Sequence, residues 1–193
     1  LLKATTLAAN PSHLMRQLSL PPDPWQENVL CSGADRILLL CSRQAGKSSV
    51  AAALALHTVL ANPRTLVLLL SPTLRQSGEL FRDKLLRFYR QLERPVLPEQ
   101  ETALTLSLVN GSRVVSLPGD EKNIRGFSGV ALLIIDEAAR VEDDLYYSVR
   151  PMLAVSGGRL VALSTPFGKR GWFYEEWGGE GNWERVKITA HEC

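Results

Sequence analysis

RILLLCSRQAGKSSVAAALALH, residues 36–57, is the stretch that decides the fold of this chain. It begins with a continuous apolar run, 36–41, which is typical of a strand that helices cover on both faces. An alanine-rich segment, 47–61, then predicts a helix that ends before Pro63. The loop between them holds one glycine, followed by a lysine and two serines. An ordinary surface turn needs no lysine at that position, so the loop is a candidate phosphate site.

The loop CSRQAGKS, residues 41–48, matches the phosphate-binding pattern G-x-x-x-x-G-K-[ST], except that Cys41 stands at the first glycine. Gly46 lets the backbone approach a phosphate, Lys47 reaches the β- and γ-phosphates, and the Ser48 hydroxyl can ligate Mg²⁺. A chance Gly-Lys-Ser in a turn is the alternative. The strand before the loop and the helix after it favour phosphate binding, because the helix N-terminus points its positive end at the ligand. The predicted nucleotide-binding residues are Ser42, Arg43, Gln44, Ala45, Gly46, Lys47, Ser48 and Ser49.

A second apolar run, 130–136, predicts a buried strand with two adjacent carboxylates at its end, Asp136 and Glu137. Ligands of an open α/β sheet bind at the carboxyl ends of its strands, where a phosphate loop also lies. We expect Asp136 to hold Mg²⁺, through water or the Ser48 hydroxyl, and Glu137 to polarise an attacking water. A helix-capping acidic pair is the alternative, but the phosphate loop disfavours it. The pair predicts hydrolysis of a nucleoside triphosphate rather than phosphoryl transfer, since no lid segment with arginines is evident.

Strand-like and helix-like segments alternate along the rest of the chain. Apolar runs predict strands at 65–71 and 159–164, and helices are expected at 74–93 and about 143–154. This alternation indicates an α/β fold with a mostly parallel sheet flanked by helices. Together with the phosphate loop and the acidic pair, it predicts a P-loop NTPase of the type with an additional strand and a catalytic glutamate (ASCE). The stretch 103–117 differs, because alternating residues flank an Asn-Gly pair and predict an antiparallel hairpin that extends the sheet.

Composition limits the function classes. The 193 residues, 45% of them hydrophobic, fit one globular domain over 1–193. The net charge of +2 demands no polyanionic partner, so a nucleic-acid role must rest on local features. Cys31, Cys41 and Cys193 form no CxxC pair, which predicts free thiols in a reducing compartment. We expect no signal peptide and no membrane contact, because no apolar run approaches about 20 residues.

The motifs together resemble the large terminase subunit of tailed bacteriophages and prophages, the ATPase motor that packages double-stranded DNA into a capsid. In that family the phosphate loop reads like SRQAGKS, often without the first glycine, so the cysteine at that position fits. LLIIDEAA, 132–139, is similar to the acidic strand of the family, and STP, 164–166, resembles its coupling motif. PDPWQENVL, 22–30, resembles its adenine-binding segment. The resemblance covers most of the chain and implies the N-terminal ATPase domain, with ATP and Mg²⁺ as ligands.

The resemblance implies roles for three further residues. Gln26 stands where the family has the glutamine that reads the base, and a carboxamide can donate and accept hydrogen bonds at once. A surface glutamine on an opening helix is the alternative. Ser164 and Thr165 end a buried strand, where their hydroxyls can register hydrolysis and pass it on. Their alternative is an ordinary turn before Pro166.

Two arginines are candidates for stabilising the transition state. Arg43 lies inside the phosphate loop and is placed to contact the γ-phosphate in cis. Arg125 precedes the acidic strand, and the resemblance implies an arginine finger that is presented to the neighbouring subunit of a ring. A solvated loop arginine is the alternative for Arg125. On the helix 80–94, three further arginines share a face that we expect to be solvated rather than bound to DNA.

The resemblance also implies partners: double-stranded DNA, the portal protein of the procapsid, the small terminase subunit and further copies of the chain in a homo-oligomeric ring. The isolated domain is expected to be a monomer without nuclease activity, since no second acidic constellation is present. Its expected location is the cytoplasm of the infected bacterium, transiently at the portal vertex. Two alternatives stay open, a helicase-like or other DNA-remodelling ATPase and a non-hydrolysing nucleotide-binding regulatory module. A retained Glu137 argues against the module.

Overall fold

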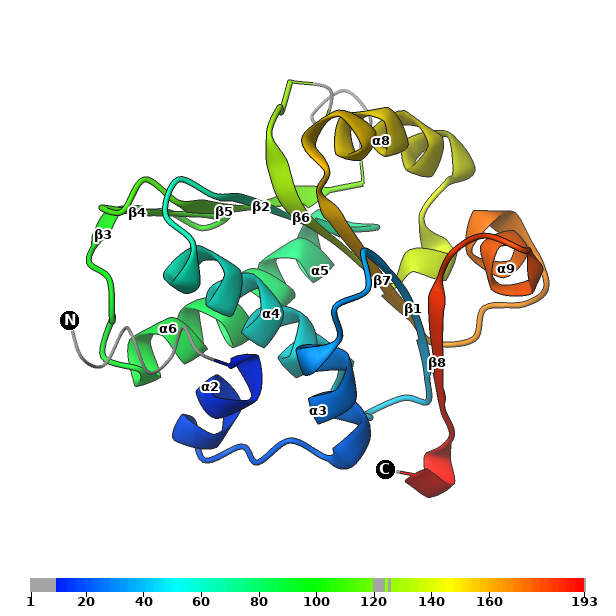
Figure 1. Cartoon of the computed structure of the whole chain (residues 1–193), viewed down its shortest axis with the longest axis horizontal. Helices are drawn as coiled ribbons and strands as arrows, with labels where there is room; N and C mark the ends of the chain where they lie inside the picture. Colours follow the sequence, from blue (N-terminus) through cyan, green and yellow to red (C-terminus); the bar gives the residue numbers. More distant parts are fainter. Residues whose placement is uncertain (1–9, 120–123, 125, 193) are drawn as a thin grey trace.

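An eight-stranded sheet forms the centre of the molecule (Figure 1). The computed structural model describes residues 10–119, 124 and 126–192. The strands are β1 (Arg36–Cys41), β2 (Leu66–Ser71), β3 (Pro98–Glu101), β4 (Thr105–Leu108), β5 (Arg113–Pro118), β6 (Val130–Asp136), β7 (Arg159–Ser164) and β8 (Glu184–Ile188). Their order is β3-β4-β5-β2-β6-β7-β1-β8, and the neighbours from β5 to β8 are parallel. The predicted class, α/β with a mostly parallel sheet, is confirmed.

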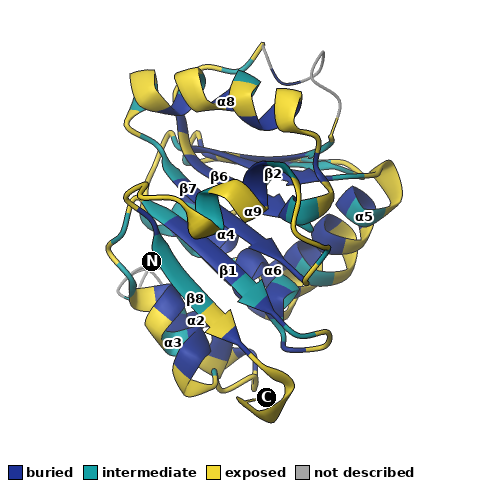
Figure 2. Cartoon of the chain, turned by 90° about the vertical axis from the view of Figure 1, so that its right-hand side faces the viewer, coloured by how far each residue is buried: buried dark blue, intermediate teal, exposed yellow. Residues whose placement is uncertain are grey.

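Helices cover both faces of the sheet. They are α2 (Pro11–Gln17), α3 (Pro24–Cys31), α4 (Lys47–Ala61), α5 (Leu74–Gly78), α6 (Arg87–Gln91), α8 (Asp143–Ser156) and α9 (Gly171–Gly178). Helix α4 packs on one face, on the same side as α2, α3 and α6, while α8 and α9 pack on the other (Figure 1). Strand β2 is therefore buried at every position, as the dark blue of Figure 2 shows. Within the described ranges, no helix combines the length and apolarity needed to cross a membrane.

The predicted hairpin is confirmed. Strands β4 and β5 pair antiparallel, and β5 joins the parallel part of the sheet through β2. Gly111 in the turn has a φ of 81°, a left-handed backbone that glycine adopts without a steric penalty. Asn110 donates from its side chain to the carbonyl of Val59 at 2.9 Å, which ties the turn to the end of α4. The hairpin is thus held to the helical layer as well as to the sheet.

The helix predicted over 74–93 is divided into three segments. Between α5 and α6 lies a π-helical segment, η1 (Glu79–Leu86), whose hydrogen bonds join residues five positions apart. Its apolar residues Phe81 and Leu85 are buried against α4. The wider turn lets Glu79, Asp83 and Lys84 line the same cavity, although residues five positions apart diverge on an α-helix. The predicted single helix was wrong in this detail.

The arginine face of the segment 80–94 has a neighbour that the sequence did not predict. Arg90 forms an ion pair with Glu101 of β3, and Arg94 Nη2 lies 4.0 Å from Glu101 Oε2. Strand β3 reads PEQE, a polar stretch with no apolar alternation, and it forms at the edge of the sheet by pairing with β4. Part of the positive charge on this face is therefore compensated within the domain.

Candidate active site

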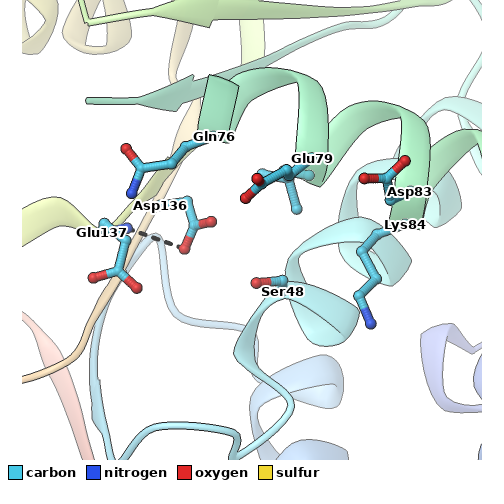
Figure 3. Close-up of a pocket in the computed structure, with 8 residues that line it drawn as sticks. Ser48, Gln76, Glu79, Asp83, Lys84, Asp136 and Glu137 are labelled. Atoms are coloured by element: carbon cyan, nitrogen blue, oxygen red, sulfur yellow. Dashed lines mark hydrogen bonds between the residues drawn. The ribbon is translucent and has the colours of Figure 1, made fainter. Parts of the chain in front are cut away.

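Four parallel strands, β1, β2, β6 and β7, end along one edge of the sheet. The segments that follow β1, β6 and β7 carry the predicted motifs, so the topology alone brings these motifs together. A cavity of about 360 Å³ opens at this edge (Figure 3). It is lined by Ser48, Gln76, Glu79, Leu80, Asp83, Lys84, Asp136 and Glu137.

The loop between β1 and α4 contains two residues with left-handed backbone conformations. Gln44 and Gly46 have φ values of 63° and 85°, and left-handed residues in such a loop turn successive N–H groups into a concave anion site. A Cβ on Gly46 would lie 2.5 Å from Gln26 Nε2, so no larger residue fits without a shift. Lys47 is 8% exposed although it carries a charge, and Arg43 is exposed. The loop therefore carries one buried cation, Lys47, and one exposed cation, Arg43.

Asp136 is a buried carboxylate at the end of β6, only 7% exposed. Burial raises its pKa to about 6, and the neighbouring charge of Glu137 adds to the rise. A hydrogen bond from the Glu137 backbone N–H to Asp136 Oδ1, 3.0 Å long, and the charge of Lys47 act in the opposite direction. The balance of these effects makes Asp136 harder to ionise than a free aspartic acid.

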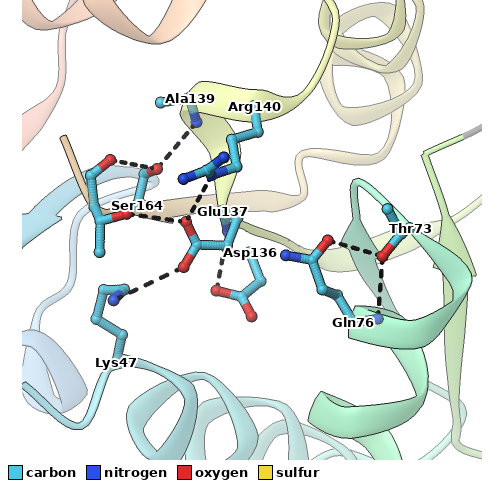
Figure 4. A network of polar contacts seen from close by, with 9 residues as sticks. Lys47, Thr73, Gln76, Asp136, Glu137, Ala139, Arg140 and Ser164 are labelled. Carbon is cyan, nitrogen blue, oxygen red and sulfur yellow. Dashed lines mark hydrogen bonds and ion pairs between the residues drawn. The ribbon is translucent and has the colours of Figure 1, made fainter. Parts of the chain in front are cut away.

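Glu137 holds the centre of a polar network (Figure 4). Its backbone has a φ of 49°, a strained left-handed conformation for a non-glycine residue. One carboxylate oxygen lies 4.0 Å from Lys47 Nζ. The other lies 3.7 Å from Arg140 Nε and accepts a hydrogen bond from Thr165 Oγ1 at 3.2 Å. Residues from the phosphate loop, the acidic strand and the end of β7 thus meet at one side chain.

Ser164 connects the same two segments through the backbone. Its hydroxyl accepts a hydrogen bond from the Ala139 N–H at 3.2 Å and donates to the Thr165 carbonyl at 2.9 Å. Ala139 belongs to a short 3₁₀ turn, η2 (Ala138–Arg140), directly after Glu137. The two residues predicted to couple hydrolysis to motion therefore contact the acidic turn directly.

Gln26 lies in the first turn of α3, beside the phosphate loop. Its Oε1 accepts a hydrogen bond from the Asp23 N–H at 3.1 Å, and its Nε2 donates to the Ala45 carbonyl at 3.3 Å. The carboxamide therefore connects the start of the helix to the loop, and it retains one N–H and one lone pair for a further partner. Its predicted contact with adenine stays a prediction. Arg125 and Cys193 lie outside the described residues.

Sequence reasoning missed five residues of this site. Gln76, Glu79, Asp83 and Lys84 reach the cavity from α5 and η1, and Arg140 reaches Glu137 from η2. None of them belongs to a motif with a recognised chemistry. The pattern Thr73-x-x-Gln76 is a capping signal, which predicts a helix start but not its position next to the carboxylates.

The chain is similar to known proteins both in sequence and in structure. A family model described as terminase large subunit, T4likevirus-type, N-terminal, matches residues 38–191. The large terminase ATPase domain of Thermus phage P74-26 has a TM-score of 0.79 and 24% identity, over 93% of this chain and 86% of that one. The large terminase of another thermophilic bacteriophage has a TM-score of 0.71 and 21% identity, over 89% of this chain and 47% of that one.

A more distant relative in structure is the N-terminal domain of the DNA packaging ATPase from bacteriophage phi29. It has a TM-score of 0.56 and 12% identity, over 79% of this chain and 90% of that one. No curated protein sequence matches the chain. The solved structures share the fold, and the family model spans most of the sequence. The chain therefore belongs to the T4-type large terminase subunit family and corresponds to its N-terminal part.

Proposed function

We propose that this domain hydrolyses ATP with Mg²⁺ at the carboxyl edge of its sheet and thereby drives double-stranded DNA into a procapsid. Membership of the large terminase family makes the chain a domain of a DNA-packaging motor ATPase. The observation that carries the proposed chemistry is the contact network of Glu137 with Lys47 and Thr165. The Glu137 side chain thus connects the loop that carries Lys47 to Thr165, the residue that follows β7.

ATP would bind with its phosphates in the loop 42–49. The left-handed turns at Gln44 and Gly46 support this placement, since they direct backbone N–H groups to one point. The free N–H and lone pair of Gln26 would read the adenine edge, next to the loop that the same side chain already contacts. Arg43, exposed in the loop, would place its guanidinium on the γ-phosphate.

The residues at the cavity fit a magnesium ion. Mg²⁺ prefers oxygen ligands and is usually bound by one or two protein groups plus waters and phosphates. Ser48 and Asp136 both line the cavity and supply a hydroxyl and a buried carboxylate. Ionised Asp136 is disfavoured by burial, so a nearby cation would compensate a real electrostatic cost. When bound, the ion would neutralise charge on the β- and γ-phosphate oxygens.

Glu137 would act as the general base. In the structure Lys47 lies 4.0 Å from one carboxylate oxygen, and this lysine would turn to the γ-phosphate once ATP is bound. That change frees one oxygen of Glu137 for the attacking water, while Arg140 and Thr165 keep the other oxygen in place. The proton of the water passes to the freed oxygen, and Thr165 would report the change to the segment after β7.

Partners follow from the proposed motor function. We expect the domain to act on double-stranded DNA with the portal protein and the small terminase subunit, in a ring of several copies. The location would be the cytoplasm of the infected bacterium and, during packaging, the portal vertex.

Glu137→Gln tests the chemistry. The amide keeps the shape of the side chain but cannot accept the proton, so hydrolysis should fall by about 10²- to 10⁴-fold while ATP affinity changes little. Lys47→Ala should instead weaken nucleotide binding itself. Both are measured as steady-state phosphate release and as binding of a fluorescent ATP analogue. Glu175→Gln, on the exposed face of α9, is the matched control. A Glu137→Gln variant with the parental rate would refute the assignment.

A further inference from the structure

Gln76 is a polar residue of the cavity that belongs to none of the nucleotide motifs. It lies in the first turn of α5 and faces Asp136 and Glu137 across the cavity (Figure 3). The remaining groups on that side are Glu79, Asp83 and Lys84 of the π-helical segment. Among the residues that line the cavity, Gln76 is the one that brings a neutral N–H donor from its side chain opposite the two carboxylates.

The orientation of the Gln76 carboxamide is set by Thr73, the N-cap of α5. The Thr73 hydroxyl oxygen accepts a hydrogen bond from the Gln76 backbone N–H at 3.3 Å. The proton of that hydroxyl is then left for Gln76 Oε1, which lies 2.9 Å away. Because the oxygen end is bound to Thr73, the NH₂ end points to the carboxylates (Figure 4). No described residue accepts a hydrogen bond from this NH₂ group.

The segment that carries Gln76 is fixed to the sheet. The Ser77 hydroxyl donates to the Leu117 carbonyl at 2.9 Å, and the Ser116 hydroxyl donates to the Ser77 carbonyl at 3.1 Å. Both serines are buried. The donor therefore has a defined position relative to the end of β6 before any ligand binds. Such preorganisation is what makes a hydrogen-bond donor effective in catalysis.

Ser71 is a buried polar residue close to Thr73 in the chain. It is the last residue of β2, two positions before Thr73, and it is fully buried. Its hydroxyl has no hydrogen-bond partner in the structure. A buried hydroxyl without a partner is unfavourable, and a water at the end of β2 would satisfy it. The strand that pairs with β2 on this side is β6, which ends in Asp136.

We propose that Gln76 is a catalytic residue that positions the attacking water for hydrolysis. The inference rests on the proposed ATPase function. The water would accept a hydrogen bond from the Gln76 NH₂ and donate one to Glu137, which leaves a lone pair directed at the γ-phosphorus. The water oxygen bonds to that phosphorus, the bond to the bridging oxygen of ADP breaks with its electron pair going to ADP, and the water proton goes to Glu137. Gln76 exchanges no proton and acts by orientation.

Gln76→Ala in the purified domain tests this role. We expect kcat to fall by about 10- to 10²-fold with little change in KM, because ATP is held mainly by the loop. Affinity for ADP with magnesium should stay within about 2-fold of the parent, whereas affinity for ADP with magnesium and aluminium fluoride, a mimic of the transition state, should fall about as much as kcat. Gln76→Asn, whose amide is one carbon shorter, should behave like Gln76→Ala. Gln91→Ala, on an exposed position of α6, is the matched control.

Thr73→Val gives a second, independent variant. It keeps the amide but removes the hydroxyl that holds Oε1, so kcat should fall by a smaller factor, about 3- to 10-fold. A Gln76→Ala protein with parental kcat and parental affinity for the aluminium fluoride complex would overturn the inference. An equal loss of affinity for ADP and for the mimic would also overturn it, because that pattern means a disturbed loop. If the parent binds ADP through Lys47 yet hydrolyses no ATP, the proposed function fails first, and the inference fails with it.

Discussion

Asp136 is a residue whose ionised form the fold disfavours, since burial raises its pKa from 3.8 to about 6. Between these two values the native state binds a proton that the unfolded chain has already lost. The contribution of Asp136 to stability therefore decreases as the pH rises through this window, and it is constant above about pH 6. The buried Asp136 carboxylate thus lowers the stability of the domain at neutral pH.

Asp136→Asn should consequently stabilise the domain without metal. At about pH 8 the gain in the free energy of unfolding should reach up to about 3 kcal/mol, the equivalent of the pKa difference. At about pH 5 the gain should shrink to roughly half, and below about pH 3 it should vanish, because both states are then protonated. Urea unfolding at these pH values measures the gain in the free energy of unfolding, with Asp35→Asn on an exposed loop as control. A variant that is less stable than the parent at the higher pH would contradict the argument.

Gly46 offers a second test at the residue scale. Its φ of 85° is strained for any other residue, and a Cβ there would lie 2.5 Å from Gln26 Nε2. Gly46→Ala should cost about 1–2 kcal/mol of stability and weaken nucleotide binding. In the double variant with Gln26→Ala the clash is removed while the backbone strain remains. The two single effects should therefore add to more than the effect of the double variant, and strict additivity in denaturant unfolding would argue against the contact.

At the scale of elements, the hairpin turn between β4 and β5 connects the sheet to helix α4. Asn110 donates to the Val59 carbonyl at the end of α4 and accepts a hydrogen bond from the Ser112 N–H at 3.0 Å. Asn110→Ala leaves these backbone groups without their partner, so the free energy of unfolding should fall by about 1–2 kcal/mol. The turn is far along the chain from the catalytic residues, so kcat should not change. Thermal unfolding measures the loss of stability, and phosphate release measures kcat. A large loss of kcat would contradict the prediction that the turn affects stability alone.

Elements with a strong local pattern could be predicted from the sequence. The helix 47–61 and the strand 130–136 were predicted with their observed bounds. An alanine-rich segment strongly favours a helix, and a short continuous apolar run favours a buried strand. The π-helical segment could not be predicted, since the same side chains suit an α-helix and the extra residue per turn is stabilised by tertiary packing. Strand β3 could not be predicted either, because its residues are polar and its partner strand decides its conformation.

The same distinction applies to the site. Lys47 and Glu137 could be predicted from the sequence because each lies in a local motif with a known chemistry. Gln76 and Arg140 became visible only when α5 and η2 were placed around the ends of the strands. Their chemistry depends on contacts between segments far apart in the sequence, and a single sequence contains no sign of such contacts.

At the scale of the whole molecule, the open question is how one domain depends on its neighbours. Arg125 is proposed as a finger in trans, so activity per subunit should rise with protein concentration, and Arg125→Ala should abolish that rise while sparing nucleotide affinity. Mixing Arg125→Ala with Glu137→Gln subunits should restore part of the activity, because each supplies what the other lacks. Phosphate release over a concentration series, with mass measured by light scattering, tests this. Flat activity and no rescue in a verified assembly would leave Arg43 as the sole arginine of the reaction.

The strand order places β7 between β1, which leads to the phosphate loop, and β6, which ends at the catalytic turn. A nucleotide bound as we propose would bridge these two strands, which are not neighbours, and the end of β7 lies between them. Any change in the separation of loop and turn deforms the hydrogen bonds that Ser164 and Thr165 make to the acidic turn. The peptide that continues from Thr165 leads to α9, on the face of the sheet opposite α4. If hydrolysis shifts Thr165 as we propose, the shift would therefore reach the surface that α9 presents.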